Sequence, residues 1–134
     1  MLAIYGNDIM MKHNDFRKSR MVSVWVGNFS SDLELDDYMN LSRNFERDFG
    51  FELNERDMPE TSVESEYTPV SKLVDGFSWS DAYAQSVVEL ATLQKIEQAT
   101  TLVVFLNFEY QPERAKPKEH APLKFIGAVP FTDE

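Results

Sequence analysis

Three apolar stretches predict the strands of this chain. In MVSVWVGNF, residues 21–29, valine stands at every second position, and a period of two in β-branched residues predicts a strand. TTLVVFLNFEY, residues 100–110, is apolar on both faces at its centre, which predicts a strand in the middle of a sheet. LKFIGAVPF, residues 123–131, predicts a third strand that pairs antiparallel with residues 100–110. Its Pro130 indicates an edge or a strand end.

Helical spacing of apolar residues predicts two main helices. Ser31 begins the sequence SDLE, a capping-box pattern in which the serine hydroxyl caps the helix and Glu34 reaches back. We expect this helix to span about 10 residues. Its imperfect apolar face consists of Leu33, Leu35, Tyr38, Met39 and Leu41. The longest helix is predicted at roughly residues 81–97, with Ser78 or Ser80 as its cap.

The segments between these elements have weaker patterns. NFERDFGFEL, residues 44–53, predicts a turn that leads into a short strand. Residues 54–68 are polar and loop-like, with a strand at residues 62–67 as one option. Pro69 suits the start of a short helix that runs through Leu73.

The order of these elements predicts an α+β fold in a single domain, with helices packed on one face of a mainly antiparallel sheet. A chain of 134 residues is long enough for one such domain with its own core. We assign this domain to residues 21–134. Residues 1–20 are weakly patterned, and we interpret them as an N-terminal extension outside the core, with an edge strand or a short helix as the alternative.

The composition excludes several classes of site. The chain has no cysteine, which excludes disulfides, thiolate nucleophiles and cysteine-ligated metals. No apolar run reaches the roughly 20 residues that a membrane helix needs. Residues 1–20 also lack the continuous apolar core of a signal peptide. We therefore expect a cytoplasmic protein without a membrane partner.

Acidic residues are concentrated in one part of the chain. The net charge is −10, and residues 31–66 carry −9 of it, with twelve acids against three arginines. Such a field repels phosphate backbones and attracts cationic proteins, so we expect no nucleic-acid partner. The alternative is that these acids only keep the protein soluble.

No group of residues has the pattern of a catalytic or metal site. His13 and His120 are the only histidines, and there is no Gly-x-Ser-x-Gly elbow or glycine-rich phosphate loop. In the first predicted helix, Asp32 and Asp36 share a face while Glu34 points elsewhere, so these acids do not converge on one cation. We therefore predict no catalytic residue, no metal ligand and no cofactor. An enzyme that uses paired carboxylates, as glycoside hydrolases do, is the competing hypothesis.

Each of the two tryptophans has two candidate roles. Trp25, on the first predicted strand, either packs beneath a helix or anchors an interface, where tryptophan is enriched. Trp79 stands just before the longest predicted helix. There it either joins the helix entry to the core or serves as a similar anchor.

Five segments, in order over residues 21–129, carry a family resemblance. They are VSVWVGNF, FERDFGF, GFSWSDAY, LVVFLNFEY and LKFIGAV. Together they resemble the immunity protein 22 family of bacterial polymorphic-toxin systems. The resemblance implies a small cytoplasmic α+β protein that binds and neutralises a cognate toxin domain. It implies no enzymatic activity.

An acidic binder suits a toxin whose substrate cleft is basic, such as a nuclease or another enzyme. The candidate toxin-binding residues are Asp36, Asp37, Tyr38, Glu46, Asp48 and Phe49. We expect the four acids to supply the electrostatic attraction and one of the two aromatic residues to be the desolvated anchor. The alternative is an acidic protein–protein interaction or regulatory module unrelated to toxins.

Overall fold

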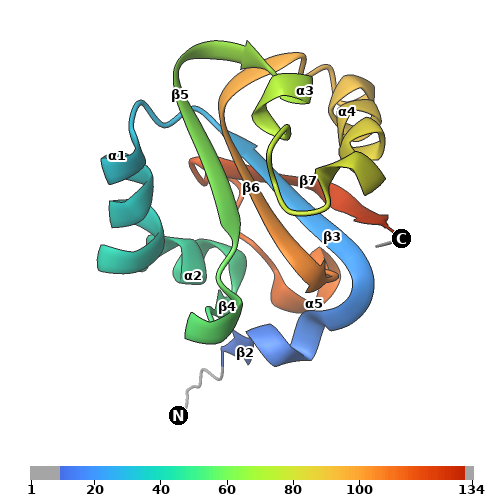
Figure 1. Ribbon diagram of the computed structural model, residues 1–134. Helices are drawn as coiled ribbons and strands as arrows, with labels where there is room; N and C mark the ends of the chain where they lie inside the picture. Colours follow the sequence, from blue (N-terminus) through green and yellow to red (C-terminus); the bar gives the residue numbers. More distant parts are fainter. Residues whose placement is uncertain (1–9, 132–134) are drawn as a thin grey trace.

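A four-stranded antiparallel sheet forms the centre of the computed structural model, which describes residues 10–131 (Figure 1). From one edge to the other, its strands are β5 (Glu60–Pro69), β6 (Gln98–Phe108), β3 (Arg17–Gly27) and β7 (Leu123–Pro130). A separate parallel pair joins β2 (Met11–Lys12) to β4 (Phe51–Glu52). The predicted α+β fold with an antiparallel sheet is confirmed.

β6 lies inside the sheet, as its apolar centre predicts, with β5 on one edge and β3 on the other. The predicted partner of β7 is wrong, because β7 pairs antiparallel with β3 and not with β6. β3 pairs with β6 on one edge and with β7 on the other, and its residues from Val22 to Gly27 are buried. Pro130 ends β7 at the outer edge, where the ladder requires no N–H from it.

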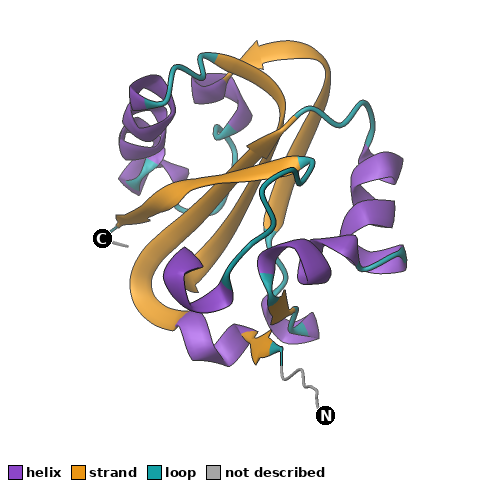
Figure 2. Cartoon of the chain, turned by 180° about the vertical axis from the view of Figure 1, so that it is seen from behind, coloured by secondary structure: helices purple, strands orange, loops and turns teal. Residues whose placement is uncertain are grey.

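Helices cover both faces of this sheet, which corrects the prediction of a single helical face (Figures 1 and 2). The helices of one face are α3 (Val70–Leu73), η4 (Ser80–Ala82) and α4 (Ala84–Leu93). Those of the other face are α1 (Asp32–Asp36), η2 (Asp37–Leu41) and α2 (Asn44–Phe49). Successive apolar residues of β3 point to opposite faces, Val24 into the first core and Trp25 into the second. Both faces of the sheet are therefore apolar, and a separate layer of helices shields each face from water.

The second core is built around Trp25, which is fully buried. The centre of its indole lies 5.2 Å from the ring centre of Phe105 and 4.9 Å from that of Phe125. Phe45 and Phe49 of α2 approach it at 5.5 and 5.6 Å. Aromatic pairs at such separations contribute about 0.5–1.5 kcal/mol each beyond the area they bury. Trp25 therefore packs beneath a helix in the core, which was the first of its two candidate roles.

α2 is a helix where the sequence pattern predicts a turn. Phe45 and Phe49 are four residues apart and bury one side of this helix against Trp25. Gly50 then ends the helix with a left-handed φ of 78°, a common helix terminus. The short strand expected after this segment is β4.

α4 is shorter than the helix predicted at residues 81–97. The residues before it form η4, and α4 begins without a side-chain cap from Ser78 or Ser80. Lys95 adopts a left-handed φ of 63° just after the helix, between α4 and the start of β6. The short helix expected after Pro69 is present as α3.

Residues 10–20 pack against the domain and do not extend away from it. They include β2, η1 (His13–Phe16) and the start of β3. Phe16 is buried in the second core, and the guanidinium of Arg114 in α5 (Pro112–Ala115) lies 5.3 Å from its ring centre. Arg17 pairs at 2.7 Å with Asp57 of η3 (Glu55–Asp57). Residues 1–9 of the expected extension lie outside the described residues.

Candidate functional site

α1 and η2 form one continuous helix on the surface of the second core. Its exposed acids are Asp32, Glu34, Asp36 and Asp37. The Glu34 N–H donates to the Ser31 hydroxyl at 3.2 Å, so Ser31 caps the helix as predicted. The Glu34 carboxylate reaches Ser30, one residue earlier than the capping-box pattern predicts, and accepts from its hydroxyl at 2.7 Å and its N–H at 3.0 Å. The Ser30 hydroxyl and then its N–H lower the pKa of Glu34, which keeps this acid ionised.

A π-helical turn at Asp37–Leu41 shapes the exposed side of this helix. The Asp37 carbonyl accepts hydrogen bonds from the Ser42 N–H at 2.8 Å and from the Ser42 hydroxyl at 2.9 Å. This turn holds one residue more than an α-helical turn, and it buries Tyr38 and Met39 while Leu41 is exposed. Such π-turns occur frequently at functional sites.

Two leucines of this helix are exposed, although the sequence pattern places them on its apolar face. Leu33 is 81% exposed and Leu41 is 73% exposed, and Asp37 stands midway between them in the sequence. We call Leu33, Asp37 and Leu41 the outer face of the helix. These leucines bury little surface in the free protein, and apolar side chains rimmed by polar ones mark interaction sites.

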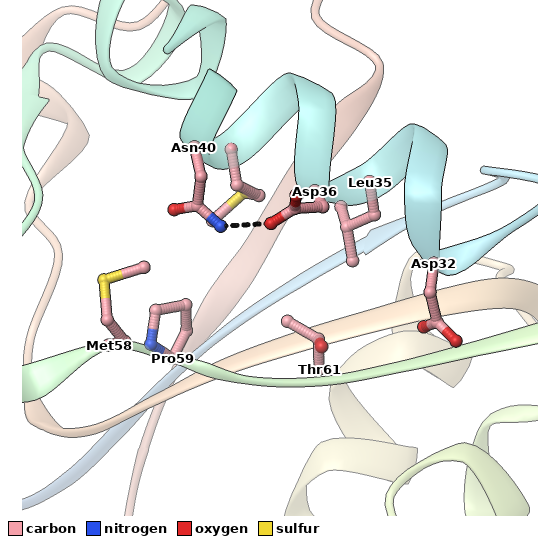
Figure 3. A pocket seen from close by; sticks show the side chains of 8 residues that line it. Asp32, Leu35, Asp36, Asn40, Met58, Pro59 and Thr61 are labelled. Carbon is pink, nitrogen blue, oxygen red and sulfur yellow. Dashed lines mark hydrogen bonds between the residues drawn. The ribbon is translucent and has the colours of Figure 1, made fainter. Parts of the chain in front are cut away.

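A groove separates another side of this helix from the segment that enters β5 (Figure 3). Its volume is about 430 Å³. The residues that line it are Asp32, Leu35, Asp36, Met39, Asn40, Met58, Pro59 and Thr61. The helix supplies the first five, and they face Met58, Pro59 and Thr61 across the groove (Figure 3). The Asn40 side-chain amide donates to Asp36 Oδ1 at 2.7 Å and orients that carboxylate.

Of the six candidate toxin-binding residues, Asp36 and Asp37 are the two that are exposed. Asp36 lines the groove, and Asp37 lies on the outer face. Within residues 10–131, neither forms an ion pair with a basic side chain. Both carboxylates are therefore accessible to a cationic partner.

Glu46 is a buried structural carboxylate in α2, with 6% of its surface exposed. It accepts hydrogen bonds from Arg43 Nε at 2.8 Å and Nη2 at 3.1 Å. Its Oε2 also accepts from the Leu53 N–H at 2.7 Å, which ties α2 to the chain after β4. Because its carboxylate oxygens accept these hydrogen bonds within the domain, Glu46 is poorly accessible to a binding partner.

Tyr38, Asp48 and Phe49 are likewise engaged inside the domain. The Tyr38 hydroxyl donates to Asp48 Oδ2 at 2.6 Å. Burial, followed by this hydrogen bond and the Asp48 charge, raises the pKa of Tyr38 above its ordinary value, so the phenol stays protonated. Phe49 packs on Trp25, and its carbonyl accepts from the Tyr110 hydroxyl at 2.6 Å. Neither aromatic candidate is displayed on the surface of the free protein.

Trp79 is the exposed tryptophan of the chain, with 52% of its surface accessible. It has a left-handed φ of 56° and precedes η4. Its ring stacks on Phe131 with a centroid separation of 6.0 Å. It lies in the helical layer of the first core, whereas the helix of the groove belongs to the second.

Leu33, Leu41 and Met58 are candidate contact residues that sequence reasoning did not select. The two leucines belonged to an apolar face already described as imperfect, because five apolar positions over nine residues cannot all point to one side of a helix. This excess of apolar positions indicated that some of the five side chains would be exposed. Met58 lies in a polar segment and had no comparable signal.

Residues 10–131 contain neither a candidate metal site nor a candidate membrane span. No group of three or more His, Asp or Glu side chains in this range could hold a metal ion. No helix in the same range is long and apolar enough to span a membrane.

A comparison with protein-family models matches residues 22–132 to the family described as Immunity protein 22. Comparisons with curated proteins and with solved structures found no match. The matched range includes the whole sheet from Val22 onward, both helical layers and the groove.

Proposed function

This chain belongs to the Immunity protein 22 family, and we propose that it neutralises a cognate toxin domain by binding it through the helix formed by α1 and η2. The family supports an immunity role in general. The contact surface and the chemistry of the toxin are our proposal. In it, the protein acts in the cytoplasm of the cell that makes the toxin or of a neighbouring kin cell.

The observation that carries the proposal is the combination of exposed leucines and exposed acids on this one helix. Asp36 and Asp37 would act at long range, because a concentrated negative field steers a basic partner and raises its association rate. Leu33 and Leu41 would act at contact, where removal of apolar surface from water supplies affinity.

The partner that this surface suits best is an enzyme with a basic substrate cleft, such as a nuclease. A cleft that binds phosphate groups presents lysine and arginine, and an acidic helix is complementary to it. The same charge disfavours direct binding of nucleic acid by this protein. Neutralisation would then follow from occupation of the cleft.

The test uses the toxin domain encoded in the same locus, with association measured at low and high salt and protection measured as growth during toxin expression. Replacing Asp36→Lys and Asp37→Lys should slow association about tenfold or more at low salt, since steering contributes factors of this size. A matched control with the same charge change, Asp75→Lys with Glu89→Lys, alters exposed acids outside this helix. It should slow association by less than about twofold.

Two results would contradict the proposal. If the wild-type protein neither binds nor protects against that toxin domain, toxin neutralisation is wrong for this pair. If the two double variants slow association equally, the contact surface does not include the α1–η2 helix.

A further inference from the structure

The floor and the rim of the groove beside α1 and η2 differ in chemistry. Leu35 and Met39 line the groove and are buried, so they form its floor. Met58 and Pro59 lie across the groove from the helix and form the opposite wall (Figure 3). Met58 is 40% exposed, so the groove leaves an apolar side chain in partial contact with water. The volume of about 430 Å³ falls in the lower part of the range for small-ligand sites.

The rim on the helix side carries two carboxylates, Asp32 and Asp36, four residues apart on one side of the helix. Within the described part of the chain, no lysine or arginine pairs with either of them. The Asn40 amide holds Asp36 through Oδ1. The two negative charges therefore lie at the mouth of an apolar groove without a counter-charge.

From this arrangement we propose that the groove binds a single lysine or arginine side chain of the partner. The aliphatic stem of that residue lies against Met39, Met58 and Pro59, and its charged head reaches Asp32 and Asp36. Long cationic side chains bury their stems along apolar surfaces in this way while the head stays near water. This inference deepens the proposed function, because it names the residue type that a toxin inserts.

Two other occupants fit the groove less well. A purely apolar side chain would bring the two carboxylates closer to a low-dielectric surface without neutralising them, which is costly. A hard metal cation needs several converging oxygens, and the described residues form no group of three acidic or histidine ligands here. A lysine or arginine side chain can do both: its aliphatic stem packs on the apolar floor, and its charge neutralises the two carboxylates of the rim.

The experiment observes the methionine methyl groups of the full chain by NMR while capped amino acids are added. The probes are N-acetyl-arginine amide, N-acetyl-lysine amide and the uncharged N-acetyl-norleucine amide. We expect the two cationic probes to give saturable shifts of the Met39 and Met58 signals in the millimolar range. The signal of Met21, which does not line the groove, should not move. Norleucine amide should cause little change.

Matched variants separate the rim charges from the general charge of the protein. Asp32→Asn with Asp36→Asn keeps side-chain size and should weaken the binding of both cationic probes about tenfold or more, since charge-assisted hydrogen bonds to the head are lost. Asp75→Asn with Glu89→Gln also removes two charges, from exposed acids that lie outside the groove and outside this helix, and should leave probe binding nearly unchanged. The unfolding midpoint of each variant checks that the fold is retained.

The inference is overturned if norleucine amide shifts the two methionines as strongly as the cationic probes do. It is also overturned if the double asparagine variant binds arginine amide as well as wild type does. Since no toxin is used, either result leaves the proposed function to its own test. A chain that binds the cationic probes but fails to inhibit the toxin would keep the groove assignment and contradict toxin neutralisation.

Discussion

Arg43 and Glu46 form a two-point ion pair, in which Arg43 Nε and Nη2 lie 2.8 and 3.1 Å from the two carboxylate oxygens of Glu46. Arg43 has a left-handed φ of 59° just before α2, and Glu46 lies within the first turn of that helix. Because Glu46 also accepts from the Leu53 N–H, this one carboxylate joins the start of α2 to the chain after β4. An acid that adds to the negative charge of residues 31–66 is thus part of the internal structure.

Replacing Glu46→Ala should therefore destabilise the fold. The change leaves the Leu53 N–H without its acceptor and removes the partner of Arg43, and we expect a loss of about 2 kcal/mol or more. Urea unfolding at pH 7 measures the effect. Asp36→Ala, which removes an exposed acid, should change the free energy of unfolding by less than about 0.5 kcal/mol. Equal effects of the two changes would contradict the structural role of Glu46.

Gly50→Ala should be more damaging than Gly76→Ala, although both glycines have a left-handed φ. At Gly50, with φ of 78°, an added Cβ would lie 2.4 Å from the carbonyl oxygen of Ala115. At Gly76, with φ of 95°, nothing lies within 4 Å. We expect about 1 kcal/mol of backbone strain at either position, and a clearly larger loss at Gly50 because α5 must move. Thermal or urea unfolding of the two variants compares them directly. Similar losses would show that the contact with Ala115 adds nothing.

His13 should make the stability of the domain fall in mild acid. Its ring is buried against Phe108 with a centroid separation of 4.6 Å. Burial lowers the pKa of His13 below its ordinary value of 6.5, an effect that the Asp57 charge opposes and the Arg17 charge reinforces. The unfolded chain then binds a proton that the folded chain resists. This stability is fully present above pH 6.5 and is lost as the pH falls from there toward the folded pKa.

The check is the free energy of urea unfolding between pH 7.5 and 5.5, a window of roughly one unit either side of the ordinary histidine pKa. His13→Phe should flatten the fall that wild type shows over this window. His120→Asn, a change at the exposed histidine, should leave the fall as in wild type. A wild-type slope that survives in His13→Phe would assign the pH dependence to other groups.

Leu33→Ala with Leu41→Ala should separate binding from folding. Both side chains are largely exposed, so the free energy of unfolding should change by less than about 0.5 kcal/mol. Binding to the toxin domain should weaken about tenfold or more if the outer face is buried in the complex. Leu35→Ala, at a buried position of the same helix, should instead cost about 2–5 kcal/mol of stability. Unchanged toxin affinity in the double variant would remove the outer face from the interface.

Local sequence patterns were sufficient for several elements. The valine period of residues 21–29, the apolar run of residues 100–110 and Pro69 each predict an element that the structure contains: β3, β6 and α3. The length of the first helix and its Ser31 cap could also be predicted. These features depend on which sides of a segment are apolar and on capping groups nearby in the chain, and both can be read from adjacent residues.

The role of individual acids in the candidate site could not be predicted in the same way. Asp36 and Glu46 have the same charge and both stand in helices, yet one lies at the surface groove and the other inside the domain. The difference arises because Phe45 and Phe49 turn α2 toward Trp25, which brings Glu46 within reach of Leu53. No spacing within α2 indicates that contact.

The sequence by itself determined the acidic character of residues 31–66 and the main strands, and it placed Pro130 at an edge or a strand end. Only the tertiary structure decided that β7 pairs with β3, that helices cover both faces of the sheet and that Phe16 is buried in the second core. The physical reason is that periodicity reports how one segment divides between apolar and polar sides. Which distant segment covers an apolar side depends on the shape and burial of both, and this is settled only when the chain is packed.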